Sequence, residues 1–324
     1  MKSNFGKTLQ LLKQANTVAI AGHIRPDGDS IGSSMALRYA LLGMGKKAVD
    51  VFTDDSIPDN FDYLHDFDKI RDSKYIDNNP WREYDLFIIL DSSTEDRIGK
   101  CTQLRAHAKK VLVIDHHQNT RIEGDEVVTN SQRAATGEML YELFTENNIE
   151  INRDIATALY TAMATDTGCF VHVNTTSYAH RAAAELIDKG IDLNAINYNN
   201  FKVYNRNIIP GLAYALRNMK FFLNDQAAVV YTPLKIIKKH NLGEIHQFKK
   251  FASEADGVRV GVIVAERQKG VFNVSLRSHG NVNVAAVAEH FGGGGHKNAS
   301  GFIITGKYKK VLKDILEQVA ESLA

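Results

Sequence analysis

The first half of the chain alternates short, almost uninterrupted apolar runs with longer segments of helical apolar spacing. The apolar runs are rich in β-branched residues and predict strands at 17–22, 47–52, 86–90 and 111–115. Helical spacing is found at about 30–43, 132–147, 153–164 and 176–189. Strands that are apolar on both faces and alternate with helices are typical of a doubly wound α/β domain with a parallel sheet.

The second half has a different pattern, which indicates a smaller mixed-sheet α/β domain. Strands are predicted at 226–232, 258–267 and 271–278, followed by a helix pattern at 282–290, the glycine run FGGGGH, another short strand and a closing helix. An asparagine-rich stretch at 189–207 lacks a long apolar period. We therefore expect a first domain over 1–188, a linker over 189–208 and a second domain over 209–324, with the functional site in the cleft between the domains.

Composition and charge exclude several classes of protein. The 324 residues are 44% hydrophobic and 24% charged with a net charge of +1, which is the balance of a folded domain without a strongly basic surface. We therefore expect no long duplex nucleic acid and no membrane as partner, although a local site can still bind a small anion. Two unpaired cysteines and the lack of a long apolar run favour a soluble cytoplasmic protein. A homodimer is left open.

Acidic residues and histidines follow several of the predicted strands of the first domain. His23, Asp27 and Asp29 come after the first strand, Asp91 after the third, and Asp115, His116 and His117 at the end of the fourth, while Asp166 follows an apolar helix. Each aspartate alone is better read as a helix cap or turn residue, and each histidine alone could be a core side chain. However, the carboxyl ends of parallel strands meet at one edge of a sheet, so the residues together predict a site.

The residue types of this site point to metal ions. Carboxylates crowded at one edge need a counter-charge, and carboxylates with imidazoles but no thiolates suit Mn²⁺ or Mg²⁺, with Zn²⁺, Fe²⁺ or Co²⁺ also open. The candidate ligands outnumber those of one tetrahedral site, which favours two ions. Two neighbouring ions are the arrangement for in-line displacement at phosphorus.

The order of these motifs resembles the DHH phosphoesterase superfamily. The motifs are HIRPDGDSIGS, ILDSS, IDHH and TDTG, and RSHGNVNVAAVAEHFGGGGHKNASG resembles the DHH-associated C-terminal domain of that superfamily. Together they span about 17–304. The two-domain layout is most similar to the nanoRNase/pAp phosphatase group, whose members hydrolyse very short oligoribonucleotides and 3′-phosphoadenosine-5′-phosphate.

This resemblance implies a role for each residue of the motifs. One metal would be bound by His23, Asp27 and Asp91, and the second by Asp29, Asp91, His116 and Asp166, so that Asp91 bridges the two ions. Both ions would most readily be Mn²⁺, with Mg²⁺ or Co²⁺ as alternatives. Asp115 would orient a histidine, and His117 would contact the substrate phosphate or the leaving oxygen; the implied catalytic residues are His117, Asp91 and Asp115.

The second domain carries features of an anion-binding site. Consecutive glycines expose backbone N–H groups, and an arginine offers a bidentate fork for phosphate. A glycine run alone could equally be a flexible turn, and a single arginine a solvated charge. The predicted substrate-binding residues are Arg277, Ser278, Gly293, Gly294, Gly295, His296 and, from the first motif, Arg25.

The expected activity is exo-acting hydrolysis of short oligoribonucleotides, of 3′-phosphoadenosine-5′-phosphate, or of both, by water activated between two metals. The expected substrates are therefore short single-stranded RNA or small nucleotides. A phosphodiesterase of cyclic or linear dinucleotides would share every catalytic motif. A nucleotide sensor without turnover is the non-enzymatic alternative, but it would not need the full set of metal ligands.

Overall fold

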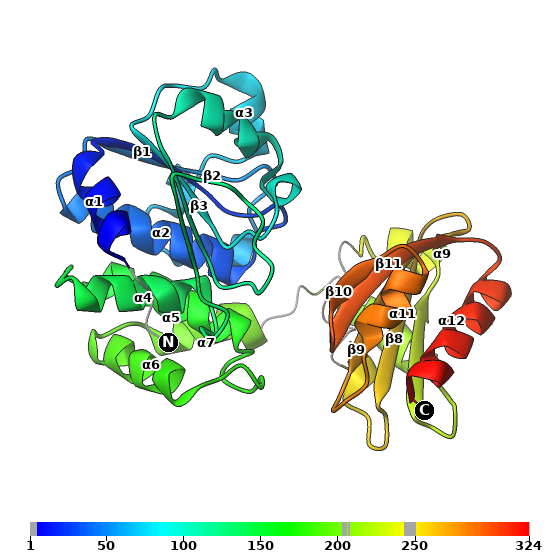
Figure 1. Cartoon of the computed structure of the whole chain (residues 1–324). Coiled ribbons are helices and arrows are strands. Elements are labelled where there is room, and N and C mark those ends of the chain that lie inside the picture. Colours follow the sequence, from blue (N-terminus) through cyan, green and yellow to red (C-terminus); the bar gives the residue numbers. More distant parts are fainter. Residues whose placement is uncertain (1–4, 203–205, 207, 243–250, 324) are drawn as a thin grey trace. The chain divides into compact units, whose positions relative to one another are not determined.

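The chain forms two compact units, Met1–Val203 and Tyr204–Ala324 (Figure 1). The computed structural model describes residues 5–202, 206, 208–242 and 251–323, with the backbone only at residue 296. Residues 203–205 and 207 of the predicted linker therefore lie outside the described residues. Its preceding part forms α7 (Leu193–Asn197) and the π-helical turn η4 (Tyr198–Lys202).

The first unit contains a five-stranded parallel sheet. Its strands are β1 (Thr17–Ala21), β2 (Ala48–Phe52), β3 (Leu86–Leu90), β4 (Val111–Asp115) and β5 (Glu126–Thr129), in the order β2-β1-β3-β4-β5. All neighbours pair in parallel. The predicted doubly wound domain and its four predicted strands are confirmed. The strand β5 was not predicted because only Val128 of its four residues is buried.

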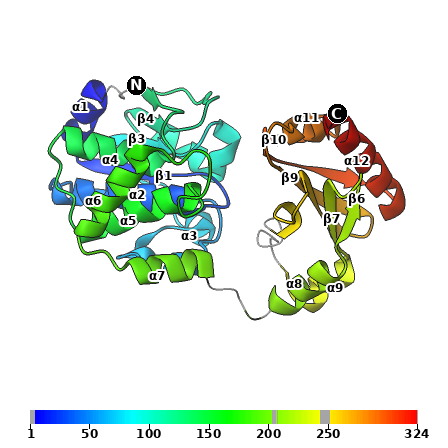
Figure 2. The same ribbon diagram turned by 90° about the horizontal axis from the view of Figure 1, so that it is seen from below.

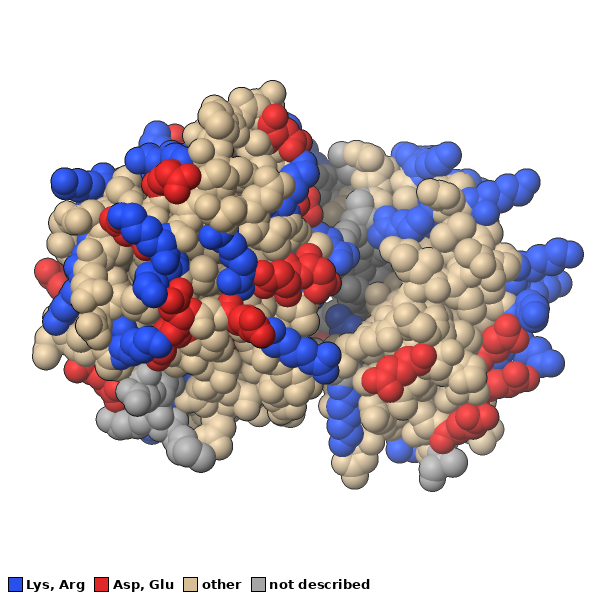
Figure 3. All heavy atoms as spheres, turned by 45° about the horizontal axis from the view of Figure 1, so that its top comes forward, with Lys and Arg blue, Asp and Glu red and all other residues tan. Residues whose placement is uncertain are grey.

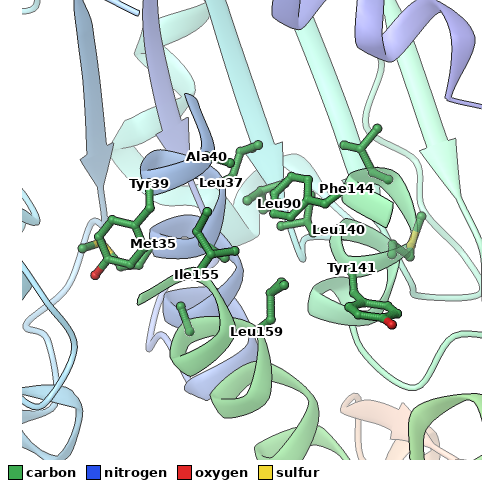
Figure 4. Close-up of a cluster of buried hydrophobic side chains, with 14 of the residues drawn as sticks. Met35, Leu37, Tyr39, Ala40, Leu90, Leu140, Tyr141, Phe144, Ile155 and Leu159 are labelled. Atoms are coloured by element: carbon green, nitrogen blue, oxygen red, sulfur yellow. The ribbon is translucent and has the colours of Figure 1, made fainter. Parts of the chain in front are cut away.

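Helices cover both faces of this sheet (Figure 2). On one face, α2 (Gly28–Gly43) and α4 (Thr136–Glu146) contact the strands, and α5 (Arg153–Asp166) packs against α2 and α4. The same core includes side chains of α1 (Gly6–Gln14), α6 (Ser177–Asp188) and α7. The other packs against α3 (Ser73–Asn78) and the 3₁₀ segment η3 (Glu95–His107). Short 3₁₀ turns η1 (Asp59–Phe61) and η2 (Phe67–Lys69) lie between β2 and α3. Figure 4 shows the larger core, in which Leu90 of β3 lies among side chains of α2, α4 and α5.

Helices α2 and α5 approach closely at a glycine. A Cβ atom added at Gly32 would lie 2.5 Å from the Ala158 carbonyl oxygen and 2.9 Å from the Ala162 nitrogen. Both contacts are with backbone, so the helices would have to separate to accept a methyl group. The close packing matters for the site because α2 begins at one group of candidate ligands and α5 ends at another.

Gly32→Ala is therefore expected to destabilise the protein by about 1–3 kcal/mol, the usual cost of overpacking a core. Gly43→Ala is the matched control, because it lies in the same helix and a Cβ there meets nothing within 4 Å. Urea unfolding of both variants measures the difference. Equal unfolding free energies for the two variants would contradict the close packing.

The second unit is built on a six-stranded mixed sheet of order β10-β11-β9-β8-β7-β6. Its strands are β6 (Lys220–Phe222), β7 (Ala227–Thr232), β8 (Val260–Gln268), β9 (Val271–Ser278), β10 (Gly294–His296) and β11 (Ala299–Thr305). Only β7 and β8 pair in parallel among these described strands. Helices α11 (Val284–His290) and α12 (Tyr308–Leu323) cover one face, and α8 (Ile208–Arg217) and α9 (Leu234–Lys239) the other. The predicted mixed α/β domain is confirmed; α8, β6, α9 and β10, which lies within the glycine run, were not predicted.

Charged side chains of both signs are interspersed over each unit on the face drawn in Figure 3. This distribution agrees with the net charge of +1. Among the described residues, no helix combines the length and apolarity that a membrane span requires.

Candidate metal centre

The end of β1 places His23 at the carboxyl edge of the first sheet. Its side chain is 5% exposed. Its Nδ1 donates a hydrogen bond to the Ile24 carbonyl at 2.8 Å, because a carbonyl can only accept. The other ring nitrogen, Nε2, lies 3.6 Å from Asp27 Oδ2 and 3.4 Å from Asp91 Oδ2. His23 is thus fixed with Nε2 facing two carboxylates.

Asp27 is both a helix cap and a member of the acidic cluster. Its Oδ1 accepts from the backbone nitrogens of Asp29 and Ser30, each at 3.1 Å, and so caps α2. Its Oδ2 faces His23. The two interpretations that the sequence offers for this residue are therefore compatible.

Asp29 lies in the first turn of α2 and is completely buried. Its Oδ1 accepts from Ser33 Oγ and from the Gly137 nitrogen, both at 2.9 Å. Its Oδ2 accepts from the Thr136 nitrogen at 2.7 Å. The start of α4 therefore fixes the orientation of this carboxylate.

Asp91 is central to the cluster. It follows β3 directly, is 2% exposed and has a φ of +54°, a left-handed conformation that is uncommon for residues other than glycine. Its Oδ2 faces His23, while its Oδ1 lies 3.6 Å from His116 Nε2 and 3.7 Å from His117 Nδ1. The two oxygens of one carboxylate thus face two different groups of candidate ligands.

His116 and Asp166 lie with Asp29 in the second group of candidate ligands, apart from His23 and Asp27. His116 Nε2 lies 3.2 Å from Asp166 Oδ2 and 3.8 Å from Asp29 Oδ2. Its Nδ1 donates to the Arg133 carbonyl at 3.3 Å. Asp166 is the last residue of α5, so a helix end meets the strand ends at this point.

Three sets of side chains have ligand atoms within 4.8 Å of one another: His23, Asp27 and Asp91; Asp29, His116 and Asp166; and Asp91, His116 and His117. The structure therefore brings together all six residues predicted to bind metal. Asp91 belongs to two of the three sets, with His23 and Asp27 in one and with His116 and His117 in the other, while His116 links the latter to the set of Asp29 and Asp166. The assignment of individual ligands stays a prediction.

Asp115 fixes the orientation of His117. The Asp115 carboxylate is completely buried, and its Oδ1 lies 2.7 Å from His117 Nδ1. Burial alone would raise the pKa of Asp115, but the hydrogen bond with His117 lowers it below its usual range. Thr120 Oγ1 donates to the other carboxylate oxygen. An ionised Asp115 therefore holds the proton of His117 on Nδ1.

The electrostatics of the cluster fit a cation. Burial and the charges of Asp91 and Asp166 raise the pKa of Asp29 well above its usual range, and burial together with Asp91 raises the pKa of Asp166. Burial alone would lower the pKa of His23, but hydrogen bonds with Asp27 and Asp91 raise it to about 11. Without a cation, the cluster thus retains protons to offset its carboxylates. A divalent ion supplies the same charge compensation, and the oxygen and imidazole donors suit it.

Binding of Mn²⁺ at pH 7 is therefore expected to release protons. A histidine must be neutral to bind a metal ion, whereas the raised pKa values keep His23 and His116 protonated in the free protein. The apparent Mn²⁺ affinity should consequently rise as the pH rises from about 6 to 8. Calorimetry in buffers of low and high ionisation enthalpy measures the release. Binding enthalpies that do not depend on the buffer would contradict this description of the site.

Several residues of the cluster could not be found from the sequence. Thr136 and Gly137 donate to Asp29 across 107 and 108 positions of the chain, and Thr136 Oγ1 donates to Asp91 at 3.3 Å. No local spacing signals such contacts. Thr120 offers a weak signal, because it lies five positions after Asp115 in the same loop.

In the second unit, the strand register places two of the predicted anion-binding positions in one row. His296 pairs with Ala299, and Ala299 pairs with Arg277 on the other side. Arg277 is half-buried, and its Nη1 donates a hydrogen bond to the carbonyl of the preceding residue, Leu276, at 2.8 Å. The side chain of His296 lies outside the described residues. The roles of Arg277 and His296 stay predictions.

The other predicted substrate contacts have structural roles as well. The Ser278 hydroxyl is buried and donates to the Val282 carbonyl at 2.9 Å. A Cβ at Gly293 would lie 2.3 Å from the Gly301 carbonyl oxygen, so close packing requires this glycine. Gly294 and Gly295 lie in β10. Arg25 lies exposed in the loop after β1 with a φ of +54°.

Comparison with known proteins gives matches over both units. The DHH family, N-terminal domain, matches residues 17–163, and the DHHA1 domain matches residues 226–324. The chain is 28% identical over 315 residues to the bifunctional oligoribonuclease and PAP phosphatase NrnA of Thermus thermophilus, covering 94% of this chain and 91% of that protein. It is 27% identical over 314 residues to the protein of the same name from Bacillus subtilis, covering 93% and 92%.

A solved structure is also similar to the whole chain. The crystal structure of an exopolyphosphatase-related protein from Bacteroides fragilis matches with a TM-score of 0.88 and 26% identity, covering 97% of this chain and 94% of that one.

Proposed function

The chain belongs to the DHH family, with the DHH domain in its first unit and the DHHA1 domain in its second, and from this premise we propose that it is a divalent-metal-dependent hydrolase of phosphoester bonds. Its proposed substrates are short oligoribonucleotides, attacked from an end, and 3′-phosphoadenosine-5′-phosphate. The observation that carries the proposal is the convergence of His23, Asp27, Asp29, Asp91, His116 and Asp166 at one sheet edge. The names of the Thermus thermophilus and Bacillus subtilis relatives support the choice of substrates.

We assign one ion to His23, Asp27 and Asp91, and the second to Asp29, Asp91, His116 and Asp166. We favour Mn²⁺ over Mg²⁺ or Co²⁺. When bound, the ions supply charge compensation for the phosphoryl oxygens and lower the pKa of water.

The protein's own side chains orient the ligands and position the proton of His117. Asp115 keeps the His117 proton on Nδ1, so that Nε2 is the ring nitrogen turned away from Asp115. We propose that this Nε2 contacts the phosphoryl or leaving oxygen of the substrate. The hydrogen bond from Thr136 Oγ1 holds the Asp91 carboxylate, whose two oxygens face His23 on one side and His116 on the other.

The DHHA1 unit is proposed to bind the remainder of the substrate. The guanidinium of Arg277, with the N–H groups of Gly294 and Gly295 and with His296, would bind a terminal phosphate, because a guanidinium and clustered N–H groups both match its geometry. The N–H of Gly293 already donates to the Ala288 carbonyl at 2.8 Å, so Gly293 would contribute close packing only. A site that binds the end of a chain favours short substrates and exo-acting cleavage.

A substrate panel in Mn²⁺ tests this function. The panel comprises 3′-phosphoadenosine-5′-phosphate, RNA of two to five nucleotides, RNA of about 24 nucleotides and cyclic di-AMP. We expect kcat/KM for the short RNAs and for 3′-phosphoadenosine-5′-phosphate to exceed that for the long RNA by at least about tenfold, or 1.4 kcal/mol of transition-state binding. Equal hydrolysis of long and short RNA would contradict the proposed preference. If only cyclic di-AMP were hydrolysed, the protein would be a dinucleotide phosphodiesterase and not an oligoribonuclease. Binding of these nucleotides without any turnover would indicate a sensor.

A further inference from the structure

The segment 133–137 runs from the loop after β5 into the first turn of α4 and holds the candidate ligands of the second ion, three of them directly and Asp166 through Asn174. Its Thr136 and Gly137 nitrogens donate to the two oxygens of Asp29, and Thr136 Oγ1 donates to Asp91. These contacts fix Asp29 and Asp91, two of the four ligands assigned to the second ion.

The same segment reaches the other two ligands through backbone carbonyls. The Arg133 carbonyl accepts from His116 Nδ1 at 3.3 Å, which directs Nε2 toward the cluster. The Ala134 carbonyl accepts from Asn174 Nδ2 at 3.2 Å, and the same amide donates to the Asp166 carbonyl at 3.2 Å. Four residues of this segment thus set the positions of Asp29, Asp91, His116 and, through Asn174, Asp166.

An ion pair between the half-buried Arg133 and the buried Glu142 anchors this segment. Arg133 donates from Nη2 to Glu142 Oε1 at 2.7 Å and from Nε to Glu142 Oε2 at 3.1 Å, a bidentate contact. Its guanidinium also lies 4.0 Å from the ring centre of Tyr178 of α6, and its Nη1 lies 3.9 Å from Glu138 Oε1. Glu138 Oε2 in turn accepts from the Ala134 nitrogen. The segment is therefore joined to both α4 and α6.

The burial of these charges makes stability alone a poor explanation for them. Glu142 is 1% exposed and Glu138 is completely buried. The desolvation of a buried ion pair can exceed its attraction, and apolar residues of similar volume are often as stable. A bidentate pair does, however, fix the orientation of both partners.

We propose that the Arg133–Glu142 ion pair is a positioning device for the second metal ion, acting through the segment 133–137. The inference rests on the proposed function only in that the centre binds divalent ions. Outer groups around metal ligands commonly contribute 10- to 100-fold to metal affinity. We therefore expect loss of the pair to weaken the second ion about tenfold and to weaken the ion at His23, Asp27 and Asp91 less, because of that ion's ligands the segment contacts only Asp91.

The test is Mn²⁺ calorimetry of the full chain with Glu142→Gln, which keeps the side-chain shape but removes the charge and one of the two acceptors. Arg133→Lys is the second variant, because it keeps the charge but loses the bidentate contact. Asp66→Asn is the matched control: it breaks the ion pair of Arg38 Nη1 with Asp66 Oδ2, at 2.9 Å, in the same unit and among no candidate ligands. Thermal unfolding without Mn²⁺ measures the purely structural effect of each change.

The expected result is an about tenfold weaker second site in Glu142→Gln and Arg133→Lys, with both affinities intact in Asp66→Asn. At saturating Mn²⁺, kcat should return to within about threefold of the wild-type value, since the ligands themselves remain. Unchanged Mn²⁺ affinities with a lowered melting temperature would overturn the inference and leave the pair a structural one. A wild-type chain that binds two Mn²⁺ but hydrolyses no phosphoester would contradict the proposed function, while a shifted affinity in the variants would still support the positioning role.

Discussion

Replacement of Asp91 by asparagine is expected to lower kcat/KM for short RNA by at least about three orders of magnitude. Both oxygens of the Asp91 carboxylate face candidate ligand groups: Oδ2 faces His23, and Oδ1 faces His116 and His117. An amide keeps the shape of the side chain but loses the negative charge and one of the two acceptor atoms. It therefore cannot serve two ions at once.

Asparagine is the appropriate replacement because it tolerates the left-handed backbone of this position. Asp66→Asn is the matched control for it, since Asp66 has the same φ of +54° as Asp91 and receives the same substitution. Steady-state kinetics in Mn²⁺ together with circular dichroism measure activity and folding. Folded Asp91→Asn with more than about a tenth of wild-type activity would contradict the central role of this carboxylate.

His117→Asn is expected to lower kcat by about 10²–10⁴-fold without changing Mn²⁺ affinity. The amide nitrogen of asparagine reproduces Nδ1 and its hydrogen bond to Asp115, but no atom replaces Nε2. The variant thus removes only the atom that we place against the substrate.

The neighbouring residue supplies the comparison. In His116→Asn the same substitution keeps a donor toward the Arg133 carbonyl and removes Nε2, the atom that faces Asp29, Asp91 and Asp166. We expect this variant to lose Mn²⁺ affinity, whereas His117→Asn should lose kcat alone. Weakened Mn²⁺ binding in His117→Asn would make His117 a metal ligand, in agreement with its distance from Asp91 but not with the role proposed above.

The fold of the first unit could be predicted largely from the sequence because its strands are buried on both faces. The uninterrupted runs at Leu86–Leu90 and Val111–Asp115 have all five residues buried, so that hydrophobicity alone identifies them. The strand β5 is an edge strand with one buried residue and carries no such signal. In the second unit, β6 is likewise an edge strand, with three residues and two of them exposed.

The candidate site was predictable to the extent that topology determines it. Once a parallel sheet is recognised, His23, Asp91 and His116 must meet at its carboxyl edge, whatever their separation in the chain. The groups that orient them could not be predicted in this way. Gly137 and Arg133 reach the cluster through backbone atoms, and a backbone N–H or carbonyl leaves no mark in the sequence. Their placement depends on how α4 packs, which local patterns do not specify.

Mn²⁺ calorimetry of the wild-type chain beside Asp91→Asn is the most direct test of a two-ion centre bridged by one carboxylate. The predicted result is two Mn²⁺ ions per wild-type chain, and in Asp91→Asn a loss of affinity at both sites rather than at one, because the Asp91 oxygens face both groups of ligands. A single ion per wild-type chain, or Asp91→Asn that binds two ions with unchanged affinity, would contradict the bridged centre.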